Sequence, residues 1–204
     1  MTAKTIAKIP YGAEVQLISE RQEWGDVGWM RGYWAQVRHE GKTGYVYSPY
    51  LSALPLPDLS NDESTCEQVI TGFEFFLSRY IRDHLRPEGG ERILYETGPN
   101  VEEFTQRVSF QWYENHVQVI SISYYEASST ALRVPGMDIF QAFAFLETLL
   151  KPCPGATELT RNPKFIKDDS GDIIEIRDPE FDGYHFRIRQ INPGTAEIQM
   201  SSGV

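Results

Sequence analysis

The sequence predicts a mixed fold in two domains: a small all-β barrel at the N-terminus and an α+β two-layer domain after it. Short runs of β-forming residues alternate with glycine-bearing turns over residues 1–53. Prolines and polar residues without periodicity follow over residues 54–63, which is typical of a linker. Residues 64–204 then switch between helical spacing and period-two patterns. At 204 residues the chain is long enough for a core in each domain.

The N-terminal domain is predicted to consist of short strands around a long loop. The strands are expected at residues 6–9, 14–18, 34–38 and 44–47, and the loop at residues 21–33. Along the last two strands, period-two alternation sends small and branched residues into the barrel and aromatic rings out of it. The inward residues are Ala35, Val37 and Val46, and the outward rings are Trp34, Tyr45 and Tyr47.

The second domain is predicted to follow the order α-ββ-α-βββ. Ser64 opens its first helix with a capping box to Glu67, and Asp138 caps the second helix with Gln141 three residues later. The strands are expected at residues 108–113, 117–125, 173–176, 184–190 and 196–200. This order predicts two helices packed on one face of an antiparallel sheet. It also suggests a duplicated unit of a helix followed by a strand meander.

The segment from Trp34 to Val46, with Gly-Lys-Thr-Gly at residues 41–44, resembles the signature of bacterial SH3-like (SH3b) domains. That signature has a tryptophan, a valine three residues later, a Gly-Lys-Thr-Gly turn, then an aromatic residue and a valine. Upstream, Pro10-Tyr11-Gly12 is similar to the family's proline-x-glycine turn. The match covers about a quarter of the chain, and the C-terminal domain resembles no family.

One departure from the family concerns the first strand, which SH3b domains carry before the position of Thr5. We expect a chain trimmed inside this domain; the alternative is an incomplete barrel with an exposed edge. The sequence opens without a signal peptide, so the chain is either cytosolic or has lost its leader. The resemblance implies a place outside the cytoplasm, in the periplasm, the envelope or the medium.

The resemblance implies binding without catalysis, with a cell-envelope component (peptidoglycan or a peptide) or a partner protein as ligand. It implies groove aromatics at Trp34 and Tyr50, with Tyr47 beside them. The long loop contributes an expected opposite wall of Trp24, Trp29 and Tyr33. Exposed rings suit proline-bearing peptides and sugar faces. The alternative is that these rings pack against the second domain or cap the barrel.

The two cysteines, Cys66 and Cys153, permit one disulfide without requiring it. Cys66 lies in the first turn of a predicted helix, and His116 follows in the same domain. This pair suggests an alternative function as a cysteine hydrolase of cell-wall peptides, similar to the NlpC/P60 family. That family's aspartate-cysteine-serine-glycine motif is absent, and Glu67 beside the cysteine disfavours a thiolate. His116 also suits a turn between two strands.

The charge, the lengths of the apolar runs and the absent motifs exclude several other classes of function. A net charge of −10 argues against nucleic-acid binding and allows a third function, as an interaction or immunity-type protein whose acidic surface meets a basic partner. No apolar run is long enough to span a bilayer. The acidic residues near Ser170-Gly171 predict a hairpin turn, and the histidines lack metal-ligand spacing. No phosphate-binding loop or dinucleotide fingerprint occurs, so neither a metal nor a cofactor is predicted.

Overall fold

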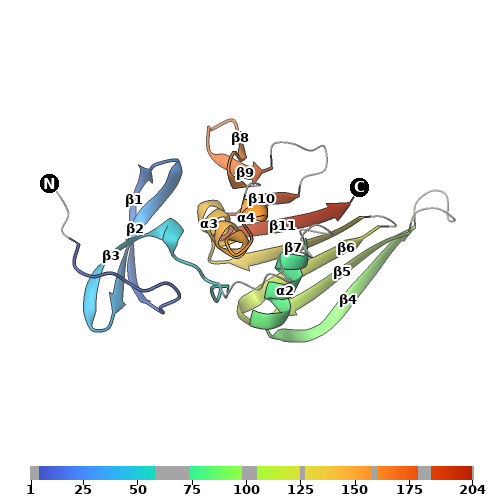
Figure 1. The fold of residues 1–204 in the computed structure, drawn as a ribbon, viewed down its shortest axis with the longest axis horizontal. Helices are drawn as coiled ribbons and strands as arrows, with labels where there is room; N and C mark the ends of the chain where they lie inside the picture. Colours follow the sequence, from blue (N-terminus) through green and yellow to red (C-terminus); the bar gives the residue numbers. More distant parts are fainter. Residues whose placement is uncertain are drawn as a thin grey trace.

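The protein is mostly β-sheet, with a small sheet near the N-terminus and a large sheet that carries two helices (Figure 1). The architecture comes from a computed structural model. It describes residues 5–57, 74–97, 105–124, 127–157, 160–178 and 185–203. Ser64, Cys66 and Glu67 lie outside these ranges, and so does the predicted start of the first helix.

The small sheet is an open antiparallel meander of three strands. These are β1 (Gln16–Val27), β2 (Met30–His39) and β3 (Lys42–Tyr47), in the order β1-β2-β3, and the 3-10 turn η1 (Ser48–Tyr50) follows directly. Neither sheet of the described residues closes on itself, so the predicted barrel is not confirmed. The expected alternation is confirmed at Ala35 and Val37, which are both buried.

The predicted loop at residues 21–33 is wrong, because these residues form the arms of the β1–β2 hairpin. Trp24 lies directly opposite Tyr33, and the turn falls at Gly28, whose φ of +65° favours glycine. Three glycines in this stretch suggest a loop when local propensity alone is considered. Cross-strand pairing, which spans up to 22 residues here, overrides that propensity. The predicted strand at residues 6–9 pairs with neither sheet.

The large sheet has eight antiparallel strands in the order β4-β5-β6-β7-β11-β10-β9-β8. They are β4 (Pro87–Thr97), β5 (Thr105–Tyr113), β6 (Val117–Ser123), β7 (Ala127–Pro135), β8 (Lys164–Lys167), β9 (Ile173–Arg177), β10 (Phe186–Asn192) and β11 (Thr195–Gly203). The two four-strand meanders meet at the β7–β11 pair. This symmetric order agrees with the suggested duplication of a helix-then-meander unit.

The predicted order α-ββ-α-βββ therefore missed three strands. β4 begins with a proline and two glycines, and a bulge between Glu88 and Arg92 interrupts its pairing with β5. β7 is rich in serine, threonine and alanine, and β8 has four residues. Each of these three segments holds only two or three residues of strong strand propensity, and pairing with neighbours places the segments in the sheet.

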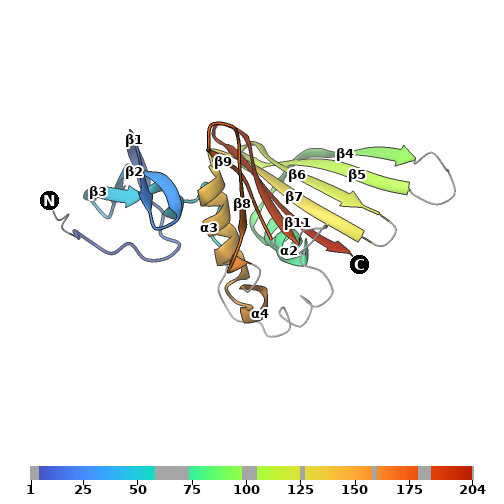
Figure 2. The ribbon, with the colours of Figure 1, turned by 90° about the horizontal axis from the view of Figure 1, so that it is seen from above.

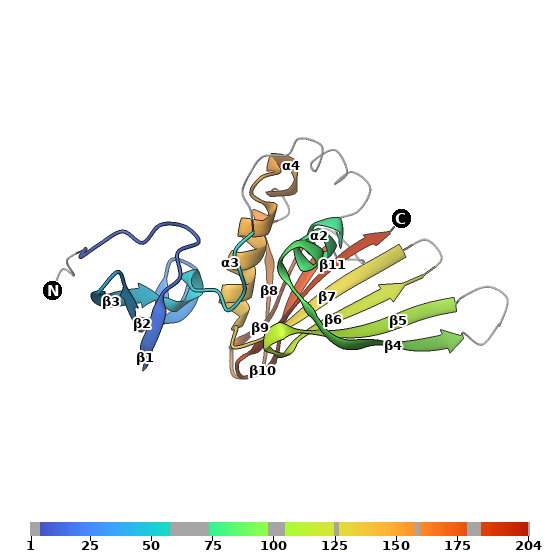
Figure 3. The ribbon, with the colours of Figure 1, turned by 90° about the horizontal axis from the view of Figure 1, so that it is seen from below.

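Two helices, α2 (Glu74–His84) and α3 (Ile139–Leu150), share one core with the large sheet, and the short α4 (Pro154–Thr157) follows α3. The predicted capping box is confirmed, because the Asp138 carboxylate accepts from the Gln141 amide while the Gln141 side chain accepts from the Asp138 amide. Figure 2 and Figure 3 show α3 between the small sheet and the large one. Among the described residues, the helices lack the length and apolarity needed to cross a membrane.

Candidate binding surface

Three of the predicted groove aromatics lie together on the small sheet. Trp34 on β2 is directly opposite Tyr47 on β3, and their ring centroids are 5.5 Å apart. The η1 turn then brings the Tyr50 ring to 6.1 Å from that of Tyr47. We call Trp34, Tyr47 and Tyr50 the aromatic cluster.

The cluster has a buried floor and exposed walls. Tyr47 is 3% exposed, whereas Trp34 is 45% and Tyr50 64% exposed. The expectation that Tyr47 points into solvent is therefore wrong. The turn of the β1–β2 hairpin reaches over its ring, and its hydroxyl lies 2.8 Å from the Gly25 carbonyl oxygen and 2.7 Å from that of Met30. Burial raises the pKa of Tyr47, so the phenol stays a neutral donor to these carbonyls.

The other three predicted rings lie elsewhere. Trp24 and Tyr33 form a T-shaped pair with centroids 5.4 Å apart, and strand alternation places Tyr33 on the opposite face of β2 from Trp34. Burial and a hydrogen bond with Glu20 raise the pKa of Tyr33 to about 12. Trp29 packs on the second domain. Its ring centroid lies 5.0 Å from that of Phe143 and 5.6 Å from that of Phe165. The expected opposite wall is therefore not assembled around the cluster.

An open cleft of about 1550 Å³ lies beside the aromatic cluster. Its walls come from residues 5–15, from Trp34, Tyr45 and Tyr50, and from the Phe145 side of α3. Tyr45, which is exposed, also lines the cleft, although from the sequence we placed it only as an outward ring and not among the groove aromatics. Its signal was present, because Tyr45 and Tyr47 alternate with inward Val46 on β3. The volume is large enough for a peptide or a sugar fragment.

The second domain holds the η1 turn, and with it Tyr50, in place. The Gln141 side-chain amide on α3 donates to the Ser48 carbonyl oxygen at 3.1 Å, and the Ser48 hydroxyl accepts from the Tyr33 amide. The Tyr80 hydroxyl of α2 donates to the Pro55 carbonyl oxygen at 2.7 Å. The walls of the cleft are thus anchored to two helices, as a preformed binding site requires.

We expect Gly32→Ala to disturb this anchoring. A Cβ at Gly32 would lie 2.4 Å from Pro49 Cδ in η1, and the proline ring cannot rotate away. Overpacking of this kind costs about 1–3 kcal/mol in the free energy of unfolding, which urea titration measures. Gly25, directly opposite on β1, is the matched control, because nothing lies within 4 Å of its Cβ position. An equal loss for Gly25→Ala would show that the cost comes from the glycine backbone and not from Pro49.

The cysteines and His116 do not form a described site. His116 occupies the turn η3 (Glu114–His116) between β5 and β6, where Asn115 and His116 both have positive φ. Its predicted place in a turn is confirmed. Cys153 is buried and does not carry a free thiol. Cys66 lies outside the described residues, so its pairing with Cys153 and its pairing with His116 both stay predictions.

The acidic residues near Ser170 form the predicted hairpin turn. The Asp168 carboxylate accepts from the backbone amides of Ser170 and Asp172, at 2.9 and 3.0 Å, and Gly171 has a φ of +85°. The Asp172 carboxylate in turn forms an ion pair with Arg31 of the small sheet at 3.0 Å. These carboxylates therefore shape a turn and contact the first domain.

Comparison of the chain with protein-family models, with curated proteins and with solved structures found no match.

Proposed function

We propose that the protein is a non-catalytic binding protein whose small sheet acts as an SH3b-like recognition module. The ligand class is a cell-envelope component, peptidoglycan or a peptide, or a partner protein, met outside the cytoplasm. The observation that carries the proposal is the aromatic cluster, in which exposed Trp34 and Tyr50 flank a buried Tyr47 beside the cleft. The sequence resemblance at residues 34–46 supports the same module.

The physical argument is that rigid rings bind at low entropic cost. Trp34 and Tyr50 each offer a large apolar face and a polar tip, and the packing around Tyr47 and η1 already restrains them. Such rings are the side chains that most often dominate the binding energy of an interface. Proline rings and the apolar faces of sugars stack on surfaces of this kind.

We expect Trp34→Ala and Tyr50→Ala each to weaken binding to insoluble peptidoglycan at least about tenfold, because each removes a central ring contact. A pull-down with increasing amounts of peptidoglycan measures the loss, and immobilised proline-rich peptide is tested in parallel. Trp24→Ala is the matched control, since Trp24 is as exposed as Trp34 but lies on β1, outside both the aromatic cluster and the cleft.

Retention of full binding to both materials by the Trp34→Ala protein would overturn the proposal. Release of soluble fragments from the peptidoglycan, lost in Cys66→Ala, would instead favour the hydrolase alternative.

A further inference from the structure

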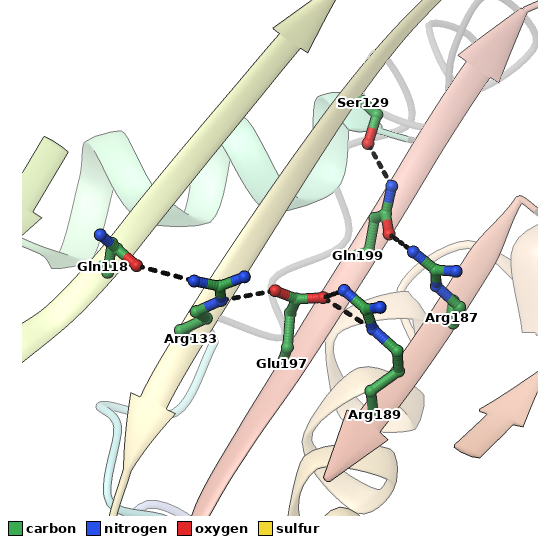
Figure 4. A network of polar contacts seen from close by, with 7 residues as sticks. All are labelled: Gln118, Ser129, Arg133, Arg187, Arg189, Glu197 and Gln199. Atoms are coloured by element: carbon green, nitrogen blue, oxygen red, sulfur yellow. Dashed lines mark hydrogen bonds and ion pairs between the residues drawn. The ribbon is translucent and has the colours of Figure 1, made fainter. Parts of the chain in front are cut away.

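The large sheet has one face that the helices do not cover. Leu132, Ile188 and Ile198 point to the other face, where they share a core with α2 and α3. The residues between them in sequence, such as Arg133, Arg189 and Glu197, point away from that core. Figure 4 shows these side chains in front of the strands and the helices behind them. Among the described residues, no helix packs on this front, which we call the open face.

A buried carboxylate holds two arginines on the open face. Glu197 is 2% exposed, and it accepts from Arg133 Nε at 2.6 Å and from Arg189 Nε at 3.0 Å (Figure 4). The Arg133 guanidinium also donates to the Gln118 side chain at 3.2 Å. Both guanidinium groups remain about one-third exposed. Each has five N–H donors, so each keeps some for a further acceptor after these bonds are made.

We call Arg133, Glu197 and Arg189 the triad. Three packed apolar side chains would stabilise the fold about as well, because removing the charges from water offsets most of their mutual attraction. The geometry of the triad suits recognition better. The central carboxylate fixes both guanidinium groups, and a fixed guanidinium binds a carboxylate in two-point fashion without first losing side-chain freedom.

Beside the triad runs a row of directly opposed residues that becomes basic toward β8. From β5 to β8 it reads Phe110, Ile120, Ala131, Gln199, Arg187, Arg177 and Lys164. Ile120, Ala131 and Gln199 in the middle are buried, so the accessible parts of the row are its aromatic end and its basic end. Arg187, Arg177 and Lys164 are cross-strand neighbours, although like charges in this position repel one another. The ion pair of Arg177 with Glu175, at 3.6 Å, offsets part of that repulsion, and an anion bound above the row would offset more of it. This accumulation of cations contrasts with the net charge of −10 for the whole chain.

We propose that the open face is a docking site for an acidic protein segment, with its carboxylates on Arg133, Arg189, Arg177 and Lys164 and its apolar side chains on Phe110 and Trp112. Trp112 stands in the triad's own row, opposite Gln118, and is exposed. At about 4.8 Å per strand the row extends about 30 Å, which matches about nine extended residues or about five helical turns.

Two other occupants fit the open face less well. A nucleic acid needs a track of cations with little interruption, and here Glu197 and Glu175 lie among the arginines of a strongly acidic protein. A second copy docked by the same face would place the basic end of the row either against itself or against the apolar end of the other copy, since a two-fold contact is self-complementary. Neither arrangement brings carboxylates to the basic end.

The test uses a fluorescein-labelled peptide of about ten residues, glutamate in one half and leucine in the other, to match the row. Fluorescence anisotropy at low salt should show binding that weakens as salt is added. We expect Lys164→Glu with Arg177→Glu to raise Kd about tenfold or more, since both replace attraction by repulsion. Lys164→Glu alone, at an exposed position, should give part of this effect while the protein stays folded, since surface substitutions usually change stability by less than about 0.5 kcal/mol.

Arg38→Glu with Lys151→Glu is the matched control, because both positions are exposed, lie off the open face and change the net charge equally. Trp34→Ala should leave this binding unchanged, which separates the open face from the aromatic cluster. Equal loss in the control pair would overturn the proposal. So would stronger binding of an oligothymidylate than of the peptide, or a concentration-dependent dimer that Lys164→Glu abolishes.

Discussion

Phe143→Ala is expected to lower the free energy of unfolding by about 3–5 kcal/mol, the largest stability effect that we predict for a single side chain. Phe143 is fully buried in the middle of α3. Its ring contacts Trp29 of the small sheet, with centroids 5.0 Å apart, and Phe186 of β10, with centroids 6.3 Å apart. Alanine therefore leaves a cavity where the small sheet, α3 and the large sheet meet. Urea unfolding followed by circular dichroism measures the loss.

Phe143→Leu is the matched control for that cavity. Leucine keeps most of the volume, and such exchanges usually cost less than about 1.5 kcal/mol. Trp29 packs on Phe143. The fluorescence of Trp29 should therefore shift toward that of a solvent-exposed tryptophan more in Phe143→Ala than in Phe143→Leu. A loss of about 1 kcal/mol or less for alanine would contradict the packing described between the two sheets.

Glu197→Ala is expected to cost about 3 kcal/mol, near the lower end of the range for breaking a buried charge pair. The substitution leaves Arg133 and Arg189 facing each other without the carboxylate between them. The lower end applies because both guanidinium groups keep about one-third of their surface in water, which screens their repulsion. Glu175→Ala is the control, since its ion pair with Arg177 is longer, at 3.6 Å. We expect it to cost less than about 1 kcal/mol.

The contribution of Glu197 should depend on pH. Burial by itself raises the pKa of Glu197, but the hydrogen bonds and charges of Arg189 and Arg133 outweigh burial and hold the pKa below the ordinary value of 4.5. A carboxyl whose pKa is lower in the folded state stabilises the fold above its unfolded pKa and loses this effect as the pH falls. The difference between the wild type and Glu197→Ala should therefore be constant near neutral pH and shrink below about pH 4.5. A difference that grows on acidification would contradict this assignment.

Features that depend on neighbours in sequence could be predicted without the structure. The capping box at Asp138 needs a side chain three residues away, and the helix α3 itself needs apolar residues at the 3.6-residue period. The inward direction of Ala35 and Val37 needs the two-residue period of a strand. The aromatic cluster was also within reach, because the turn at Glu40-Gly41 brings β3 back along β2. Each prediction rests on geometry that spans a few residues.

Contacts between distant segments decided the rest. The burial of Tyr47 depends on the carbonyl groups of Gly25 and Met30, which the β1–β2 hairpin carries over its ring. The place of Trp29 depends on α3, more than a hundred residues further along the chain. The local sequence around Tyr47 or Trp29 does not reveal these partners. Packing between distant segments decides which aromatic rings become covered.

By itself the sequence determined which face of each strand is apolar and which is charged. The tertiary structure decided which strands lie side by side and so which charged side chains meet. Arg133, Arg189 and Glu197 alternate with apolar residues along β7, β10 and β11, so their common outward direction follows from strand periodicity. Their assembly around one buried carboxylate required the order β7-β11-β10, which joins strands from the two meanders. Strand order depends on long-range pairing, and no local propensity specifies it.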